Sequence, residues 1–463
     1  MPAIITKDFR IHNARQFEES FSESADTYYL GIGRPQAFAN DQAFNDGTDS
    51  SPPTPVDSVG SVEHYVYDDL LSAKKVTSSD ISLVIPRKNW TTGTTYDYYR
   101  HDYGEINSAG NTITANSGAT TLLDSNFYVM NSTFDVYKVI DNNGDSASTV
   151  EPTGNKSTSV FSTSDSYKWK YMYSLSATEQ ANFLSTDFMH LSTESSDFST
   201  TAGAIEHVKI TAGGSGGTNG TYTDVDIRGD GSSGKCTVVV SSNAVSSVTI
   251  TTAGSGYTFA SVLASDIGGV SGADIDFIIS PPGGHASDVV TELGGFFVML
   301  NVDLTQADGS GDFNVTNDFR RIVLLRNPTD STTSATATAS TLDATKSITF
   351  SGTPGSFQAD EKITQATTGA VGFVVDFNST TKVLRYIQPQ FANQGIDSSQ
   401  NLTAFSGTQT VTGATSSATG TPSSHDTTPE LTADTGEILY IENRKPIVRA
   451  SDQTENVKLI VEF

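Results

Sequence analysis

The sequence contains very little cysteine and few positive charges. A single cysteine, Cys236, occurs in 463 residues, so no disulfide can form within the chain and no cysteine-based metal cluster can be built. Lys and Arg number 27 against 53 Asp and Glu, which gives a formal net charge of −26. Because so acidic a chain repels phosphate backbones and anionic lipids, we predict that neither nucleic acid nor a membrane is a partner.

Long apolar runs are also missing. No stretch approaches the roughly 18 consecutive apolar residues of a membrane-spanning helix. The opening MPAIITKDFRIHN lacks the hydrophobic segment of a signal peptide. We therefore expect a chain that is made and used in soluble form.

The composition favours strands over helices. Charged residues make up 17% of the sequence, whereas Ser, Thr, Asn and Gly are frequent throughout. Such a composition is typical of many short strands joined by turns. We predict a mainly β fold with a multi-domain β-sandwich or barrel architecture, two short N-terminal helices and inserted small β modules.

Two helices and two strands are predicted near the N-terminus. Residues 13–23 carry apolar side chains at helical spacing after a capping residue, Asn13. A second helix is predicted over residues 57–75, where valines and a leucine form one apolar stripe. The strands are predicted at residues 27–33 and 81–85.

The C-terminal stretch contains two strong strand patterns around a short polar turn. Residues 437–443 have apolar side chains on both faces, which suits a strand covered on both sides. In residues 457–463 one face is wholly apolar, and this face should meet the core. We predict a closing hairpin that pairs with segments near the N-terminus.

An internal repeat with a period of about forty residues lies within residues 205–280. The sequence VKITAGGSG at residues 208–216 recurs as VTITTAGSG at residues 248–256, and each copy continues to a second strand that follows a glycine. We interpret this region as a duplicated β insert.

The distribution of strands and linkers predicts three domains. Residues 331–344 and 407–429 are rich in Ser, Thr and Ala and are predicted as linkers around a small β module. The predicted domains are a discontinuous β-sandwich core of residues 1–90, 289–330 and 431–463, a second β domain of residues 91–288 that holds the duplicated insert, and the module of residues 331–430.

Two glycine motifs resemble catalytic or phosphate-binding sequences. Gly229, Gly231 and Gly234 fit G-x-G-x-x-G, but a strand follows them where phosphate binding needs the start of a helix. Residues 213–217 fit G-x-S-x-G, yet they join strand to strand, so Ser215 lacks the geometry of a nucleophile elbow. Both motifs are predicted to be turns.

The remaining polar motifs also have simpler explanations. Asp141, Asn143 and Asp145 have calcium-loop spacing, but the glycine lies one place early and no glutamate occupies the twelfth position. The seven histidines show no paired spacing of the kind that metal sites use. The tripeptide Arg228-Gly229-Asp230 could indicate an adhesive site, but a glycine-rich turn alone explains it. We predict no catalytic residue, no metal site and no cofactor, and hence no enzyme.

A family resemblance rests on residues at both ends of the chain and in one central stretch. These residues are Gly33, Arg34, Pro53, Pro55, Asp57, Ser58, Pro86, Arg87 and Trp90, then Asn327 and Pro328, then Gly436, Glu437, Glu442, Asn443, Arg444, Pro446, Asp452 and Gln453. In order and spacing they resemble the baseplate wedge subunit of T-even-type contractile-tailed phages that is called gene product eight.

The resemblance implies a structural virion protein of the tail baseplate, synthesised in the host cytoplasm. It implies assembly with other wedge proteins around the central hub, a homodimer, and no small-molecule substrate. Two alternatives remain open. One is a receptor-binding or tail-fibre adhesin that uses the glycine-rich repeats, and the other is a polysaccharide-cleaving tailspike with a carboxylate pair.

Overall fold

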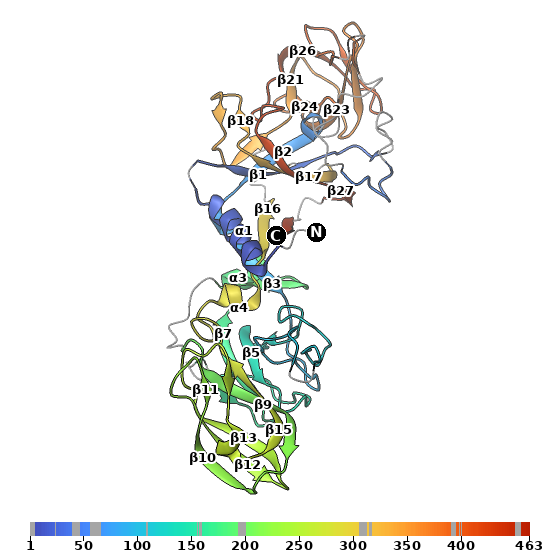
Figure 1. The fold of residues 1–463 in the computed structure, drawn as a ribbon. Coiled ribbons are helices and arrows are strands. Elements are labelled where there is room, and N and C mark those ends of the chain that lie inside the picture. Colours follow the sequence, from blue (N-terminus) through green and yellow to red (C-terminus); the bar gives the residue numbers. More distant parts are fainter. Residues whose placement is uncertain are drawn as a thin grey trace. The chain divides into compact units, whose positions relative to one another are not determined.

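The computed structural model describes residues 5–23, 25–38, 47–55, 66–107, 110–154, 156, 160–192, 201–304, 313, 317–389, 395–397, 399, 401–449 and 455–463. Strands dominate these residues and helices are short (Figure 1), so the predicted mainly β class is confirmed. The chain divides into two compact units, each discontinuous in sequence. Unit 1 comprises residues 1–16, 82–299 and 460–463, and unit 2 comprises residues 17–81 and 300–459.

Unit 2 contains a five-stranded antiparallel sheet. In spatial order its strands are β20 (Thr341–Asp343), β2 (Leu70–Val76), β1 (Tyr28–Gly33), β17 (Phe319–Arg326) and β27 (Glu437–Ile447). The two central strands, β1 and β17, are buried on both faces, as their almost continuous apolar sequences require. Tyr29, Ala73, Val323 and Leu325 form the middle of one core beneath this sheet.

Unit 2 also contains a closed barrel. Its strands, in order around the barrel, are β21 (Lys346–Ser351), β24 (Val383–Ile387), β23 (Ala370–Asn378), β22 (Lys362–Gln365), β25 (Val411–Gly413) and β26 (Thr419–Asp426). Ile348, Ile363, Val374 and Leu384 fill its interior. Residues 407–429, predicted as a linker, therefore supply the last two barrel strands. The other predicted linker contains β20 and one strand of the short pair β18 (Thr329–Asp330) and β19 (Ala335–Thr336).

Unit 1 includes an aromatic sheet in the order β4 (Tyr128–Met130), β5 (Asp135–Asp141), β7 (Lys168–Ser174) and β6 (Phe161–Ser162). A further sheet, whose strands contain residues of both units, has the order β28 (Asn456–Glu462), β16 (Phe297–Asp303), β3 (Ile81–Pro86) and β8 (Phe188–His190). The predicted hairpin of the last two strands is therefore wrong, because β27 pairs with β17 and β28 belongs to this second sheet. The hairpin prediction assumed that two strands close in sequence pair with each other.

The repeat region of unit 1 forms one packed body. Its elements are β9 (Ile205–Ser215), β10 (Gly220–Asp226), β11 (Arg228–Gly229), β12 (Lys235–Ser241), β13 (Ala244–Thr252), β14 (Ala260–Ser261), η3 (Ala264–Ile267) and β15 (Ser271–Ile279). The two copies exchange partners, because β9 of the first pairs with β15 of the second, while β12 pairs with β13. Gly214 and Gly216 have positive φ, and so do Gly254 and Gly256 at the same places in the second copy.

The helices differ in part from the expected ones. Helix α1 (Lys7–Ser20) begins where the Thr6 hydroxyl accepts a hydrogen bond from the Phe9 amide at 3.3 Å, so Asn13 lies inside the helix. Of the second predicted helix, residues 57–65 lie outside the described part of the chain. Residues 66–68 are helical, and β2 then replaces the helix expected to continue to residue 75.

The remaining helical segments are η2 (Ser78–Asp80), α3 (Ala177–Phe183) and α4 (Val289–Leu293). Of the helices that the structure describes, none has the length and apolar character needed to cross a bilayer.

Candidate assembly site

A buried ionic network surrounds Asp69 in unit 2. Arg321 Nη1 donates to Asp69 Oδ1 at 2.8 Å, and Arg34 Nη1 lies 3.7 Å from Asp69 Oδ2. The Arg34 and Asp69 side chains are each 2% exposed. Arg34 has a φ of +59°, a left-handed conformation that costs a non-glycine residue free energy unless its surroundings hold it. The Asp69 network therefore ties the end of β1 to β17.

Gly33 allows the close backbone approach beside this network. A Cβ at this position would lie 2.8 Å from the Asp69 carbonyl oxygen and 3.0 Å from the Leu70 Cα. The next residue, Arg34, donates its amide to the same Asp69 carbonyl at 2.9 Å. The glycine and arginine of the resemblance thus have one structural role, which is to hold β1 against the start of β2.

The network extends to β27 through Asn443. Arg321 Nε donates to Asn443 Oδ1 at 3.0 Å, and Asn443 Nδ2 donates to the Pro53 carbonyl at 3.1 Å. Pro55, two residues further on, is half-buried. Sequence positions hundreds of residues apart therefore meet at one place.

Arg320 makes a second charged contact nearby. Its Nε and Nη2 atoms each lie 3.0 Å from one carboxylate oxygen of Asp49. Burial alone would raise the pKa of Asp49, but the hydrogen bonds from Arg320 and the Phe38 amide, together with the charges of Arg320 and Arg34, lower it.

The central stretch at Asn327 and Pro328 lies against the residue before β27, Gly436. Asn327 Oδ1 accepts from the Thr27 amide at 2.8 Å, and Asn327 Nδ2 donates to Asp26 Oδ1 at 2.6 Å. Gly436 has a φ of +76°, and a Cβ there would lie 2.6 Å from the Arg326 carbonyl and 2.8 Å from the Pro328 nitrogen. A glycine is needed here on both counts.

Pro86, Arg87 and Trp90 lie in unit 1 and fasten the end of β3. The Pro86 carbonyl accepts from the Tyr128 hydroxyl at 2.7 Å. Arg87 Nη1 donates to the Ser185 carbonyl at 2.7 Å, and Trp90 Nε1 donates to Ser148 Oγ at 3.1 Å. The predicted positions are therefore divided between the two units, and Asp57, Ser58, Asp452 and Gln453 lie outside the described residues.

Strand β27 presents two adjacent exposed apolar side chains, Leu439 and Tyr440, which we call the β27 patch. These residues are 37% and 38% exposed. The strand is the last of its sheet, and no other described strand pairs with its outer edge. The prediction of burial on both faces is wrong for Leu439 and Tyr440. The outer edge of β27 therefore combines unpaired backbone groups with exposed apolar side chains in the described part of the chain.

Charged residues surround the β27 patch. Glu442 accepts a hydrogen bond from the Tyr440 hydroxyl at 3.2 Å and lies 3.5 Å from Arg444 Nε. Glu437, at the start of the strand, lies 3.4 Å from Arg326 Nη1. Pro446 lies where the pairing with β17 is irregular, so its missing amide proton breaks no regular ladder.

A second buried ionic group, which the sequence analysis did not predict, lies in unit 1. Lys138 on β5 is fully buried and is paired with Glu292 on α4. Glu292 also accepts hydrogen bonds from the Ala286 and Asp288 amides at 3.1 and 3.3 Å. Burial lowers the pKa of Lys138, while Glu292 opposes this shift.

Three further charged or titratable groups adjoin this pair. Lys170 is directly opposite Lys138 on β7, and His285 Nε2 lies 3.8 Å from Glu206 Oε2. Burial, together with the two lysines, lowers the pKa of His285 well below its usual range, so the ring is neutral. A lysine within the apolar run of β5, DVYKVID, was the available sequence signal for the cluster.

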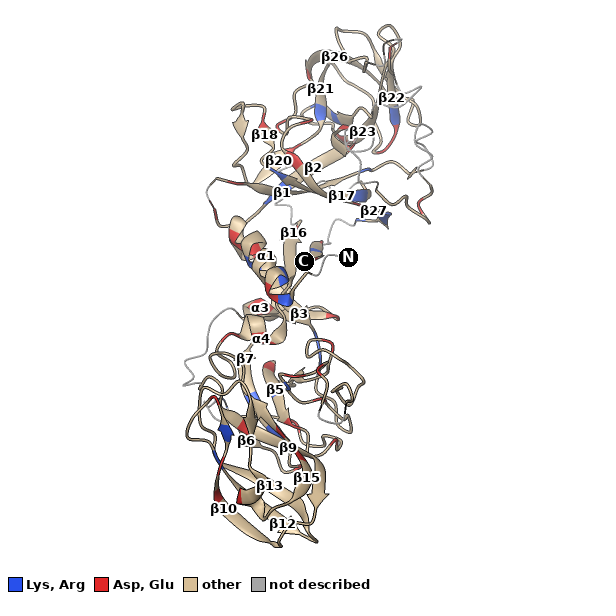
Figure 2. Ribbon diagram, viewed as in Figure 1, with Lys and Arg blue, Asp and Glu red and all other residues tan. Residues whose placement is uncertain are grey.

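None of the motifs examined for chemistry forms a catalytic arrangement in the described residues. Gly229 ends β11, and strand β12 follows the glycines, so no helix begins at this motif. Ser215 ends β9 and is exposed. In the part of the chain that the structure describes, no group of three or more His, Cys, Asp and Glu residues is placed to hold a metal ion. Acidic and basic residues are dispersed over the strands and loops (Figure 2).

Comparison with known protein families gives one match. A family model described as Phage-Gp8, Bacteriophage T4 Gp8, matches residues 3–151 and 386–463. The matched ranges contain the Asp69 and Asn443 parts of the network, the Pro86 to Trp90 segment and the β27 patch, whereas Asn327 and Pro328 lie outside them. No curated protein matches the chain.

Proposed function

Because this chain belongs to the Phage-Gp8 family of bacteriophage baseplate structural proteins, we propose that it is a subunit of the wedge of a contractile tail baseplate. In this role it assembles with other wedge proteins around the central hub and acts without catalysis. We further propose that it forms a homodimer and is made in the host cytoplasm before it joins the virion.

The observation that carries the proposal is the β27 patch. It lies within the matched C-terminal range, on a strand whose inner face is fixed by Arg321 and Asn443. Exposed tyrosine and leucine on a rigid strand supply contact area at little cost in conformational entropy. We therefore assign the β27 patch as a surface for a neighbouring baseplate protein.

The test of this surface is a double variant, Leu439→Ser with Tyr440→Ser, supplied to phage that lack the wild-type chain. We expect its incorporation into particles to fall at least tenfold, since an aromatic anchor contributes about 2 kcal/mol or more to an interface. Its free energy of unfolding should change by about 1 kcal/mol or less, because both side chains are exposed.

The matched control is Phe259→Ser with Leu263→Ser in unit 1, where the two side chains are 61% and 45% exposed. The control removes a similar apolar area and should assemble like wild type. Equal loss in both variants, or full assembly of the β27 variant, would refute the assignment of the patch.

The homodimer has its own test. Sedimentation of the isolated chain at micromolar concentration should give twice the chain mass of 49.1 kDa. A clean monomer mass would contradict the dimer, and a trimer mass would favour the tail-fibre alternative.

A further inference from the structure

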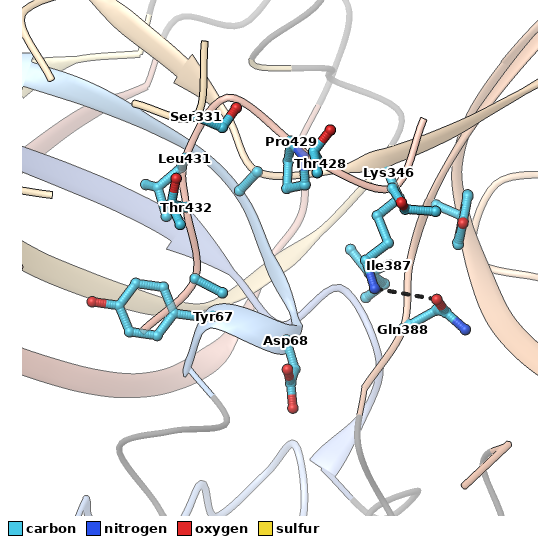
Figure 3. Close-up of a pocket in the computed structure, with 14 residues that line it drawn as sticks. Tyr67, Asp68, Ser331, Lys346, Ile387, Gln388, Thr428, Pro429, Leu431 and Thr432 are labelled. Carbon is cyan, nitrogen blue, oxygen red and sulfur yellow. Dashed lines mark hydrogen bonds between the residues drawn. The ribbon is translucent and has the colours of Figure 1, made fainter. Parts of the chain in front are cut away.

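A cavity of about 320 Å³ lies in unit 2 where the chain passes between the five-stranded sheet and the barrel (Figure 3). Its walls come from the segment before β2, the start of β21, the end of β24 and residues 427–433 after β26. The volume is at the lower end of the range of small-molecule sites. Ile387, Pro429 and Leu431 give the cavity an apolar side.

Lys346 is the basic residue in the described lining of this cavity. Its Nζ donates to Gln388 Oε1 at 3.2 Å, and no carboxylate of the described residues lies within ion-pair distance of it. Burial lowers the pKa of Lys346, and the more distant carboxylate of Asp68 opposes the shift. The ammonium group thus has a neutral partner and lacks a close anion.

Hydrogen bonds hold the side-chain amide of Gln388 with its oxygen toward Lys346. Its Nε2 atom donates to the carbonyls of Val371 and Thr403, each at 3.1 Å. Gln388 Oε1 is thereby directed at Lys346 Nζ, as Figure 3 shows. The ammonium group is held at the cavity wall with donor capacity to spare.

Two hydroxyl groups of lining residues have no hydrogen-bond partner. The Tyr386 hydroxyl and the Thr432 Oγ1 atom are both buried, and the structure gives neither a donor nor an acceptor. Leaving such a group unsatisfied costs about 1–3 kcal/mol. Both residues border the same cavity as Lys346, but neither hydroxyl oxygen is accessible from it, so the Lys346 ammonium is the group that an occupant of the cavity would bind.

We propose that this cavity binds a single carboxylate carried on a short aliphatic stem. The Lys346 ammonium supplies the countercharge and a hydrogen-bond donor, and the apolar side holds the stem. Asp68, which also lines the cavity, disfavours a ligand with two negative charges. The carboxylate comes either from a free small acid or from an Asp or Glu side chain of a neighbouring protein. The second source rests on the proposed function.

The test uses the full chain and sodium butyrate as the probe, with butyramide as its uncharged isostere. Saturation-transfer NMR should show binding of butyrate with an affinity at least tenfold higher than that of butyramide. Equal binding of the two, or no binding of butyrate at up to about 50 mM, overturns the proposal. This comparison needs no variant and does not depend on the baseplate role.

Variants then locate the bound carboxylate. Lys346→Met should lower the butyrate affinity at least tenfold. Lys445→Met, which removes an exposed lysine in the same unit, should bind as wild type does. Unchanged binding by Lys346→Met, with the protein folded, contradicts the assigned position.

Acetylation of lysines identifies the source of the carboxylate. If a neighbouring protein supplies it, Lys346 is acetylated at least tenfold more slowly in assembled particles than in the isolated chain. If the source is a free acid, adding butyrate slows acetylation of the isolated chain and assembly has no further effect. Acetylation of Lys346 that neither butyrate nor assembly slows rejects the site.

Discussion

Replacing Asp69 with asparagine is expected to lower the free energy of unfolding of unit 2 by about 3–5 kcal/mol. The change leaves Arg34 and Arg321 buried beside a neutral amide in place of a carboxylate. Such a loss is comparable to much of the total stability of a domain. The expected result is a protein whose unit 2 unfolds at a much lower denaturant concentration.

The two tryptophans allow the units to be followed separately. Trp90 and Trp169 both belong to unit 1, and the sequence contains no others. Tryptophan fluorescence therefore reports unit 1, while circular dichroism reports both units. For Asp69→Asn we expect a shift in the dichroism transition and little change in the fluorescence transition.

Glu437→Gln is the control for this prediction. It removes one partner of an ion pair with Arg326, but the Glu437 side chain is 62% exposed. Exposed pairs contribute little because water and salt screen them, so we expect a change of about 0.5 kcal/mol or less. If Asp69→Asn and Glu437→Gln have similar effects, the buried network does not hold unit 2 together.

The second large effect is expected in unit 1. Lys138→Met should lower the free energy of unfolding of this unit by about 3–5 kcal/mol, because it leaves Glu292 buried without its cation. The transition followed by tryptophan fluorescence should move to lower denaturant concentration. Lys138→Met alone should lower the free energy of unfolding of unit 1 more than removal of both charges does.

The double variant Lys138→Met with Glu292→Gln tests this reasoning. The substituted amide keeps one acceptor oxygen, which can take one of the two hydrogen bonds that the Ala286 and Asp288 amides donate to Glu292, and no uncompensated charge remains at that pair. We expect the double variant to regain about 1–3 kcal/mol relative to Lys138→Met. A double variant as unstable as the sum of the two single variants would show that the charges do not act as a pair.

The strands with the clearest apolar patterns could be predicted from the sequence. Residues 27–33 and 81–85 were expected to be strands, and β1 and β3 occupy these positions within one residue at each end. The recurrence of the glycine-rich sequence could also be read from the sequence, and the glycines at equivalent places in the two copies have positive φ. These features depend on local sequence, which is where propensity and periodicity are informative.

The choice of partners could not be predicted in the same way. β27 and β28 are neighbours in sequence but lie in different sheets, and the two repeat copies exchange strands. Strand pairing is decided by packing across the whole chain, which local alternation does not record. The predictions of a C-terminal hairpin and of a helix that continues to residue 75 are wrong for this reason.

The candidate site was predictable in part. The resemblance pointed to Gly33, Arg34 and Asn443, but their meeting at Asp69 and Arg321 depends on contacts between residues far apart in the chain. Exposure of Leu439 and Tyr440 follows from a register shift between β17 and β27, which an apolar run does not reveal. The partners of Lys138 and Lys346 likewise come from distant segments.

Imaging of the assembled particle is the most direct test of the wedge assignment. In a reconstruction of the phage tail by electron microscopy, the two units should fit density in the part of the baseplate that surrounds the central hub. The β27 patch should face a neighbouring protein there. Density for this chain in a trimeric fibre or tailspike at the periphery, or its absence from the baseplate, would contradict the account.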